Sequence, residues 1–181
     1  YNNKVNERVN AFSGLKALST RLVNALETTD ATAQVIKDAK GFNRKLQGKR
    51  ASTATTPIDP NTPAPATIST SQQSYDQQIQ HLAGLTSVLI SEPSYAPNET
   101  ALATATLTAL QANLTAKNNE VATAYTNISN SRIARNNTLY ADSTGLVEIA
   151  TEVKKYIKSL YGASSPEFAQ VKGIEFKKAK K

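Results

Sequence analysis

Residues 98–140, NETALATATLTALQANLTAKNNEVATAYTNISNSRIARNNTLY, contain neither proline nor glycine. Mostly apolar positions recur in this stretch with a near-heptad rhythm: Leu102, Leu107, Leu110, Leu114, Val121, Ala124, Ile128, Arg135 and Leu139. This period is typical of a helix that packs against other helices. About 40 residues at roughly 1.5 Å each give a rod of roughly 60 Å. The stretch therefore predicts one long helix, capped by Asn98.

Shorter amphipathic stretches precede this long helix. A first helix is predicted over about residues 5–26, where apolar side chains recur every three or four positions: Val5, Val9, Phe12, Leu15, Leu18, Leu22 and Leu26. A second is predicted over about residues 31–40 and ends at Gly41. A third is predicted over about residues 74–91, before Pro93.

A last long helix is expected after an N-cap at Ser143, and Gly162 is expected to end it. Ser165 and Pro166 then predict a short helix, with serine as the cap and proline at the first helical position. The apolar stripe of the last long helix is expected to face the core, and it consists of Leu146, Ile149, Ala150, Val153, Ile157 and Leu160.

Residues 51–73 differ from the rest in composition. The stretch ASTATTPIDPNTPAPATISTSQQ has four prolines, many Thr and Ser, and few apolar side chains, so it predicts an extended connector. At about 3.1 Å per residue it could span about 70 Å. The predicted fold is therefore all-α: an elongated antiparallel four-helix bundle with short accessory helices and a Pro/Thr-rich crossover. We expect a single domain over residues 1–181, with a first helical unit (1–50) and, after the connector, a long helical hairpin and a C-terminal unit with a basic tail (74–181).

The two ends of the chain resemble each other. GLKALSTRLVNAL (14–26) aligns with GLVEIATEVKKYI (145–157). Each is followed by a break, a short predicted helix and a basic segment that contains Lys-Gly: KGFNRKL (40–46) in one case and KGIEFKK (172–178) in the other. A degenerate duplication of a helix–break–helix unit explains this pattern. Two amphipathic helices with similar heptads explain it equally well.

The amino-acid composition excludes most kinds of catalytic site. The chain has no cysteine and a single histidine, His81, which excludes thiolate sites, disulfides and two-histidine metal sites. The glycines form no phosphate-binding loop, and no apolar run approaches the roughly 18 to 20 residues that cross a bilayer. We therefore expect no enzyme, no cofactor, no metal site and no membrane span. A lone histidine of this kind is usually a surface or core-edge residue.

Charge is unevenly distributed in the chain, whose net charge is +7. Residues 1–50 hold ten Lys and Arg against four acids, residues 51–116 hold four acids and no Lys or Arg, and residues 117–181 hold eleven bases against six acids. Such segregation suits an anionic partner or a head-to-tail assembly of chains, and solvated helix ends with a basic tail are the alternative.

Two basic segments, 37–50 and 172–181, are candidates for contact with an anion or a partner through Lys37, Lys40, Arg44, Lys45, Lys49, Arg50, Lys172, Lys177 and Lys178. If the segments converge, they form a patch that could bind a nucleic-acid backbone by releasing counterions. Only Phe42 and Phe176 lie among them, so base stacking is not indicated. The alternative is a solvated tail.

Arg132 and Arg135 are further candidates for contact with an anion or a partner. They lie three positions apart on the long predicted helix, a spacing that suits a clasp for a phosphate or carboxylate. The structural alternative is that both arginines extend from a helix seam or pair with an acid of a neighbouring helix.

Three stretches together resemble an uncharacterised family of helical Bacteroidetes proteins. They are YAPNE (95–99), SNSRIARNNTLY within 129–140 and YGASSPEFAQVKGIEF within 161–176, and the likeness covers about residues 94–178. The resemblance implies a bacterial source and a helical build. It implies no activity, because no function is known for that family.

The sequence favours a non-enzymatic structural or assembly protein that binds itself or another protein through long helices and charged ends. The alternative is a binding module for an anionic polymer, nucleic acid or an acidic surface, through segments 37–50 and 172–181. Exported and cytoplasmic locations are both compatible with the composition. The start at Tyr1 fits either a cleaved leader or an excerpt of a longer product.

Overall fold

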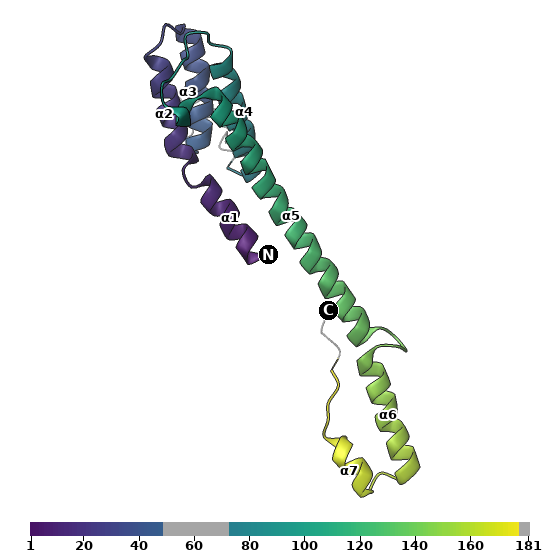
Figure 1. Ribbon diagram of the computed structural model, residues 1–181. Coiled ribbons are helices and arrows are strands. Elements are labelled where there is room, and N and C mark those ends of the chain that lie inside the picture. Colours follow the sequence, from purple (N-terminus) through teal and green to yellow (C-terminus); the bar gives the residue numbers. More distant parts are fainter. Residues whose placement is uncertain (49–72, 178–181) are drawn as a thin grey trace, which may run out of the picture. The chain divides into compact units, whose positions relative to one another are not determined.

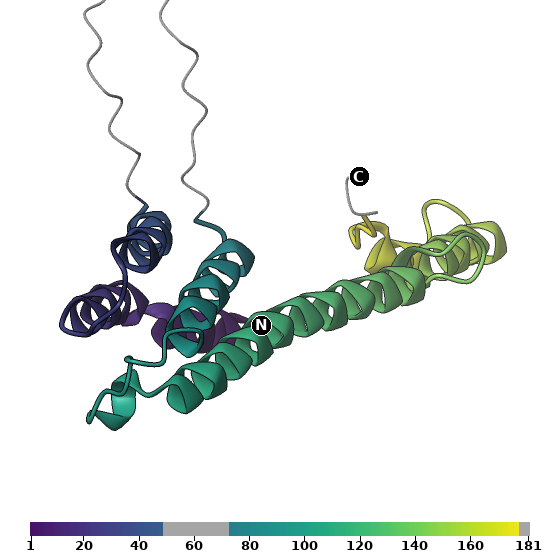
Figure 2. The same cartoon turned by 90° about the horizontal axis from the view of Figure 1, so that it is seen from above.

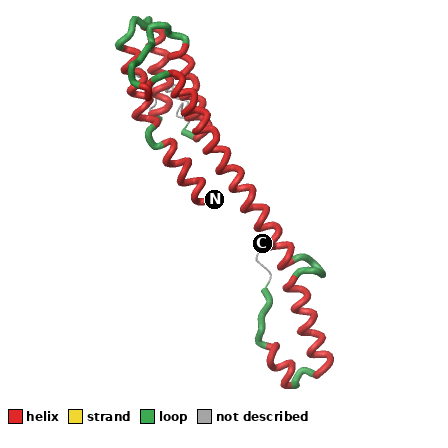
Figure 3. Tube along the Cα trace, in the orientation of Figure 1, coloured by secondary structure: helices red, strands yellow, loops and turns green. Residues whose placement is uncertain are grey.

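The computed structural model describes residues 1–48 and 73–177, and this part of the chain is helical, without strands (Figure 3). The all-α prediction is confirmed. The chain divides into two compact units, residues 1–123 and 124–181, which are described separately below. The elements (Figure 1) are α1 (Asn2–Phe12), α2 (Leu15–Glu27), α3 (Ala33–Gln47), α4 (Tyr75–Ile90), the 3-10 turn η1 (Thr100–Leu102), α5 (Thr104–Tyr140), α6 (Leu146–Tyr161) and α7 (Pro166–Lys172).

The predicted four-helix arrangement and the single-domain organisation stay predictions. The connector lies outside the described residues except for Gln73. The side-chain amide of Gln73 donates to the Lys45 carbonyl over 2.6 Å, which links the residue before the N-cap of α4 to the end of α3.

The predicted first helix is wrong in one respect, because it is broken at Ser13 and Gly14 into α1 and α2. Both residues form helix poorly, and the Ser13 hydroxyl donates to its own turn at the Asn10 carbonyl over 2.8 Å. The break changes which side of α1 faces inward. Phe12 is buried, whereas Val9, predicted on the apolar stripe, is exposed.

The second helix is longer than predicted. Gly41 lies inside α3, and the helix ends at Gly48, whose φ of 74° is the left-handed conformation that glycine adopts most readily. Thr32 caps the start of α3 by accepting from the Val35 amide. A glycine in mid-helix costs only about 1 kcal/mol relative to alanine, so the packing of α3 against α2 and α4 overrides it.

The core of the first unit lies between α2, α3, α4 and the start of α5. Ser74 caps α4 by accepting from the Gln77 amide. Leucines dominate the fully buried set, which comprises Leu22, Leu26, Leu46, Leu82, Leu85, Leu89, Leu107 and Leu114. One close approach shapes this core: a Cβ added at Gly84 of α4 would overlap the ring of Phe42 on α3.

The long helix begins later than predicted. Asn98 does not cap it, since η1 intervenes and α5 starts at Thr104. The heptad rhythm is confirmed in its first part, where Leu107, Leu114 and Val121 are the buried positions. Their spacing of seven keeps one narrow seam against the neighbouring helices.

Figures 1 and 2 show α1 alongside the part of α5 that belongs to the first unit. Four charged side chains join the two helices. Lys4 lies 3.0 Å from Glu120, and Lys117 lies 2.8 Å from Glu7. Pairs along each helix, Lys4 with Glu7 at 3.1 Å and Lys117 with Glu120 at 3.2 Å, close the set into a ring. We call these four residues the charge ring.

A polar and aromatic cluster continues the contact of α1 with its neighbours. Arg8 donates to the Asn118 side chain over 2.9 Å, and its guanidinium lies 4.0 Å from the centre of the Tyr75 ring. Phe12 meets the same ring edge-on at 4.7 Å. Lys4, Glu7 and Arg8 thus form much of the face by which α1 docks.

The second unit contains the end of α5, α6 and α7, and Figure 1 shows α7 folded back beside α6. Gly162 ends α6, and Ser165 caps α7 with Pro166 in its first turn, all as predicted. The predicted cap of α6 is wrong: Gly145 occupies the N-cap position, and Ser143 lies in the preceding turn with a φ of 64°. Neither α6 nor α7 contains a buried residue.

Candidate functional surfaces

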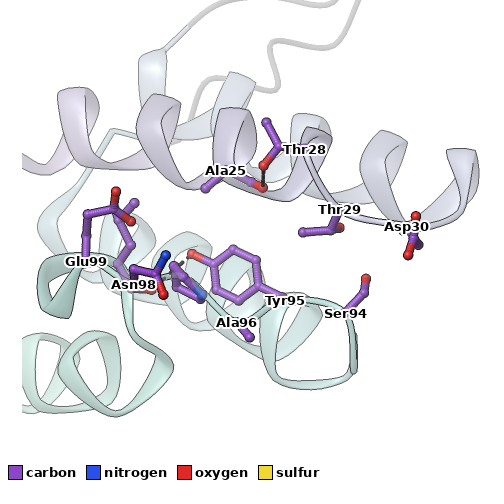
Figure 4. A pocket seen from close by; sticks show the side chains of 11 residues that line it. Ala25, Thr28, Thr29, Asp30, Ser94, Tyr95, Ala96, Asn98 and Glu99 are labelled. Atoms are coloured by element: carbon purple, nitrogen blue, oxygen red, sulfur yellow. Dashed lines mark hydrogen bonds between the residues drawn. The ribbon is translucent and has the colours of Figure 1, made fainter.

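A polar hollow of about 560 Å³ lies where the turn after α2 faces the segment between α4 and η1 (Figure 4). Its lining includes the acids Asp30 and Glu99, together with Thr28, Thr29 and Tyr95. Each hydroxyl is already engaged: Thr28 donates to the Ala25 carbonyl over 2.8 Å, Thr29 to Leu26 over 2.7 Å and Tyr95 to Leu102 over 3.0 Å. Ser94 also lines the hollow, and its hydroxyl donates to the Glu92 carboxylate over 2.6 Å.

Two ionisable groups at or beside this hollow, Tyr95 and Glu92, have shifted pKa values. Burial, and secondarily the nearby Glu99 carboxylate, raises the pKa of the Tyr95 phenol above its ordinary value, so the phenol stays a hydrogen-bond donor. The hydroxyl and backbone amide of Ser94 donate to Glu92 and lower the pKa of that carboxyl. The Ser94 hydrogen bonds thereby favour the charged carboxylate of Glu92 in the segment between α4 and η1.

His81 is buried in α4, and its Nε2 atom has no hydrogen-bond partner. Burial lowers the pKa of the imidazole, and the Lys45 charge lowers it further, so the ring is neutral near pH 7. Within residues 1–48 and 73–177, no three His, Asp or Glu side chains gather in a way that could hold a metal ion.

Four of the predicted contact residues come together on α3. Lys37, Lys40, Arg44 and Lys45 line a hollow of about 750 Å³ beside Val88, together with Phe42 and Asp38. Lys40 also forms an ion pair with Glu27, and the Lys45 ammonium lies 5.5 Å from the centre of the Phe42 ring. We call this surface the α3 basic hollow.

The other predicted contact residues are dispersed. Arg132 and Arg135 are exposed on α5, and Arg135 donates to the adjacent Asn136 side chain over 2.8 Å. Lys172 and Lys177 are exposed in the second unit, where Lys177 pairs with Glu175 at 2.8 Å. The remaining three, Lys49, Arg50 and Lys178, lie outside the described residues.

The most unusual surface is on α6. Leu146, Ile149, Val153, Tyr156 and Leu160 are all exposed, by between 45% and 67%. Their alternating steps of three and four place them in one row along the helix. We call this row the α6 stripe. The sequence predicted Leu146, Ile149, Val153 and Leu160 on a core face, and the structure leaves these four open to solvent. Ala150 and Ile157 of the same predicted face are partly buried.

The matching helix of the first unit shows the contrast. Leu15 is 3% exposed, whereas its counterpart Leu146 is 57% exposed. Leu22 is fully buried, whereas its counterpart Val153 is 51% exposed. In the first unit, α3, α4 and η1 pack against α2, whereas in the described part of the second unit α6 packs mainly against α7.

The flank of α6 beside α7 is occupied. The Lys154 ammonium donates to the carbonyls of Lys172 and Ile174 over 2.7 and 2.8 Å, and that of Lys158 lies 5.9 Å from the Phe168 ring. The opposite flank carries Glu152 and Lys155, which are both exposed. The stripe thus lies between a covered flank and an open, charged one.

None of the helices in the described ranges combines the length and the apolar character needed to cross a bilayer. Comparison of the chain with known protein families, curated proteins and solved structures finds no significant match. The resemblance to a Bacteroidetes family stays a prediction, and the case for function rests on the surfaces described above.

Proposed function

We propose that this chain is a non-enzymatic assembly protein that binds another protein surface through the α6 stripe. The observation that carries the proposal is the exposure of the stripe on a helix without any buried residue. Ten of the thirteen large apolar side chains exposed in the described part of the chain belong to the second unit, which has only 58 of the 181 residues. Concentration of apolar surface on this scale marks an interaction site.

Energetics support the same conclusion. Burying the exposed half of a Leu, Ile or Val side chain contributes about 1 kcal/mol, so covering the five side chains contributes on the order of 5 kcal/mol. An isolated 16-residue helix is marginal in water, and α7 covers only one flank of α6. A partner therefore supplies much of the stability that the first unit obtains from its own core.

The row also indicates the kind of partner. Apolar side chains at heptad spacing on a helix are the pattern that a second helix covers, by inserting its own side chains between them. An assembly built from helix–helix contacts is consistent with this spacing.

Site-specific photo-crosslinking in cells that express the chain tests the proposal. A benzophenone amino acid at Ile149 is expected to form covalent adducts with a protein, to be identified by mass spectrometry. The same probe at Arg21, an exposed polar position on α2, is the matched control and is expected to form few adducts. Equal, low yields at both positions would contradict an assembly role for the stripe.

The α3 basic hollow favours a second candidate function, binding of an anionic polymer. Its support is the convergence of four predicted basic side chains beside Phe42 and Val88. Affinity for a labelled single-stranded DNA is expected to fall steeply with salt, and Lys37→Glu with Arg44→Glu is expected to weaken it further. Absence of binding at low salt would exclude this candidate.

A further inference from the structure

We infer that the partner of the α6 stripe is a second copy of the same chain, with α6 pairing antiparallel to α6 of the other copy about a two-fold axis near Val153 and Lys154. This inference rests on the proposed function and names its partner. Three features of the described residues support it: the supply of apolar surface, the charge on the open flank and the area available.

The first unit offers no matching surface of its own. Its exposed large apolar side chains in the described ranges are Tyr1, Val9 and Ile90, which are dispersed over α1 and the end of α4. In the described part of the chain, the apolar surface that matches the α6 stripe in size is therefore the α6 stripe of a second copy. A two-fold axis lets both copies bury it at once, which is the commonest symmetry of protein dimers.

The open flank is self-complementary in an antiparallel pair. Glu152 and Lys155 lie three positions apart, so both are on the same side of α6. A two-fold axis perpendicular to two antiparallel helices brings that side of one helix next to the same side of the other. With the axis near the middle of α6, each Glu152 lies opposite the other copy's Lys155, and the contact occurs twice. The antiparallel helix dipoles favour the same arrangement.

The area agrees with a small specific pair. Side chains of this size that are about half exposed leave on the order of 100 Å² each, so the five residues of the stripe offer on the order of 500 Å² per copy. The two copies together would bury about 1,000 Å², which is the lower end of specific protein–protein interfaces.

The chain has no cysteine, so single cysteines placed on α6 report the pairing geometry directly. Val153→Cys lies beside the proposed axis and is expected to oxidise to a disulfide-linked dimer. Leu146→Cys and Leu160→Cys lie near opposite ends of α6, roughly 20 Å from their own copies at 1.5 Å per residue, so neither is expected to crosslink alone. A mixture of these two variants is expected to form the mixed dimer.

Charge reversal tests the register independently. Glu152→Lys and Lys155→Glu are each expected to weaken dimerisation, measured by sedimentation equilibrium, by about tenfold, since each creates two like-charge contacts. The double reversal within one chain is expected to restore the wild-type value. Circular dichroism of each variant shows whether its helices are intact.

The outcomes separate the two proposals. Crosslinking of Leu146→Cys with itself would show a parallel pair and overturn the inference. A wild-type chain that stays monomeric, with no disulfide in Val153→Cys, would also overturn it, as would flotation of that monomer with phosphatidylserine vesicles in place of pairing. The proposed function would survive if the Ile149 probe captured a different protein, and would fall if that probe captured nothing.

Discussion

The contact between the Phe42 ring and the backbone of Gly84 determines how closely α3 and α4 approach. The Phe42 ring, which is partly buried against the core and also lines the α3 basic hollow, occupies the position that a Cβ at residue 84 would take, so the ring must shift when that Cβ is added. Gly84→Ala is therefore expected to lower the free energy of unfolding of the first unit by about 1 to 3 kcal/mol. Urea unfolding followed by circular dichroism measures this change.

Gly41 provides a matched control on the facing helix. It also lies within a helix, but a Cβ added there meets no atom within 4 Å. Gly41→Ala is expected to stabilise α3 by up to about 1 kcal/mol, because alanine loses less backbone entropy on folding. Similar destabilisation by both substitutions would show that helix propensity, rather than overlap with Phe42, dominates at these sites.

At the scale of elements, the charge ring holds α1 to α5. Hydrogen bonds from Lys117 and Lys4 lower the pKa of Glu7, and those from Lys4 and Lys117 lower the pKa of Glu120. The same contacts raise the pKa of both lysines. The contribution of the ring to stability is thus present between the ordinary pKa values of glutamate and lysine. It is lost as the pH falls through the lowered glutamate values or rises through the raised lysine values.

Hydrogen exchange of the α1 amides measures this attachment. We expect protection of α1, after correction for intrinsic exchange, to fall between pH 6 and pH 3, because an 11-residue helix is marginal once it is undocked. High salt is expected to weaken protection at pH 6, since the ring is exposed to solvent. Lys117→Met should reduce both effects and Lys37→Met should not; equal behaviour of the two variants would contradict the role of the ring.

The sequence predicted the ends of elements where one residue's chemistry fixes them. Ser165 with Pro166, and Gly162, act as predicted, because a cap hydroxyl or a helix-terminating glycine acts locally. Gly14 and Gly41 show the limit of such rules. One lies at a break and the other inside a helix, and the difference arises from tertiary packing that a single sequence does not display.

At the scale of the whole molecule, periodicity identified the apolar side of α6 but could not show what covers it. The patterns of α2 and α6 are nearly the same in sequence, yet Leu22 is buried and Val153 is exposed. What differs is the set of elements packed against each helix, since α4 and η1 contact α2. The α6 stripe was therefore predicted as a core, and only the structure indicates that it is a candidate interface.

A single substitution in the stripe should separate the behaviour of the two units. Val153→Glu places a charge in the middle of the stripe and is expected to abolish association through it, with loss of amide protection in α6 and α7. The core of the first unit should keep its protection, because it contains no residue of α6. Thr115→Glu, an exposed polar position on α5, is the control, and an equal loss of association in that variant would contradict the assignment.

The absence of any buried residue in α6 and α7 has a thermodynamic consequence. Under the proposed pairing, ordering of this hairpin follows mass action, so its melting point rises with the amount of chain present while that of the first unit stays constant. Gene dosage would then set the fraction of molecules with an ordered hairpin. The protein would respond to its own abundance without any bound effector.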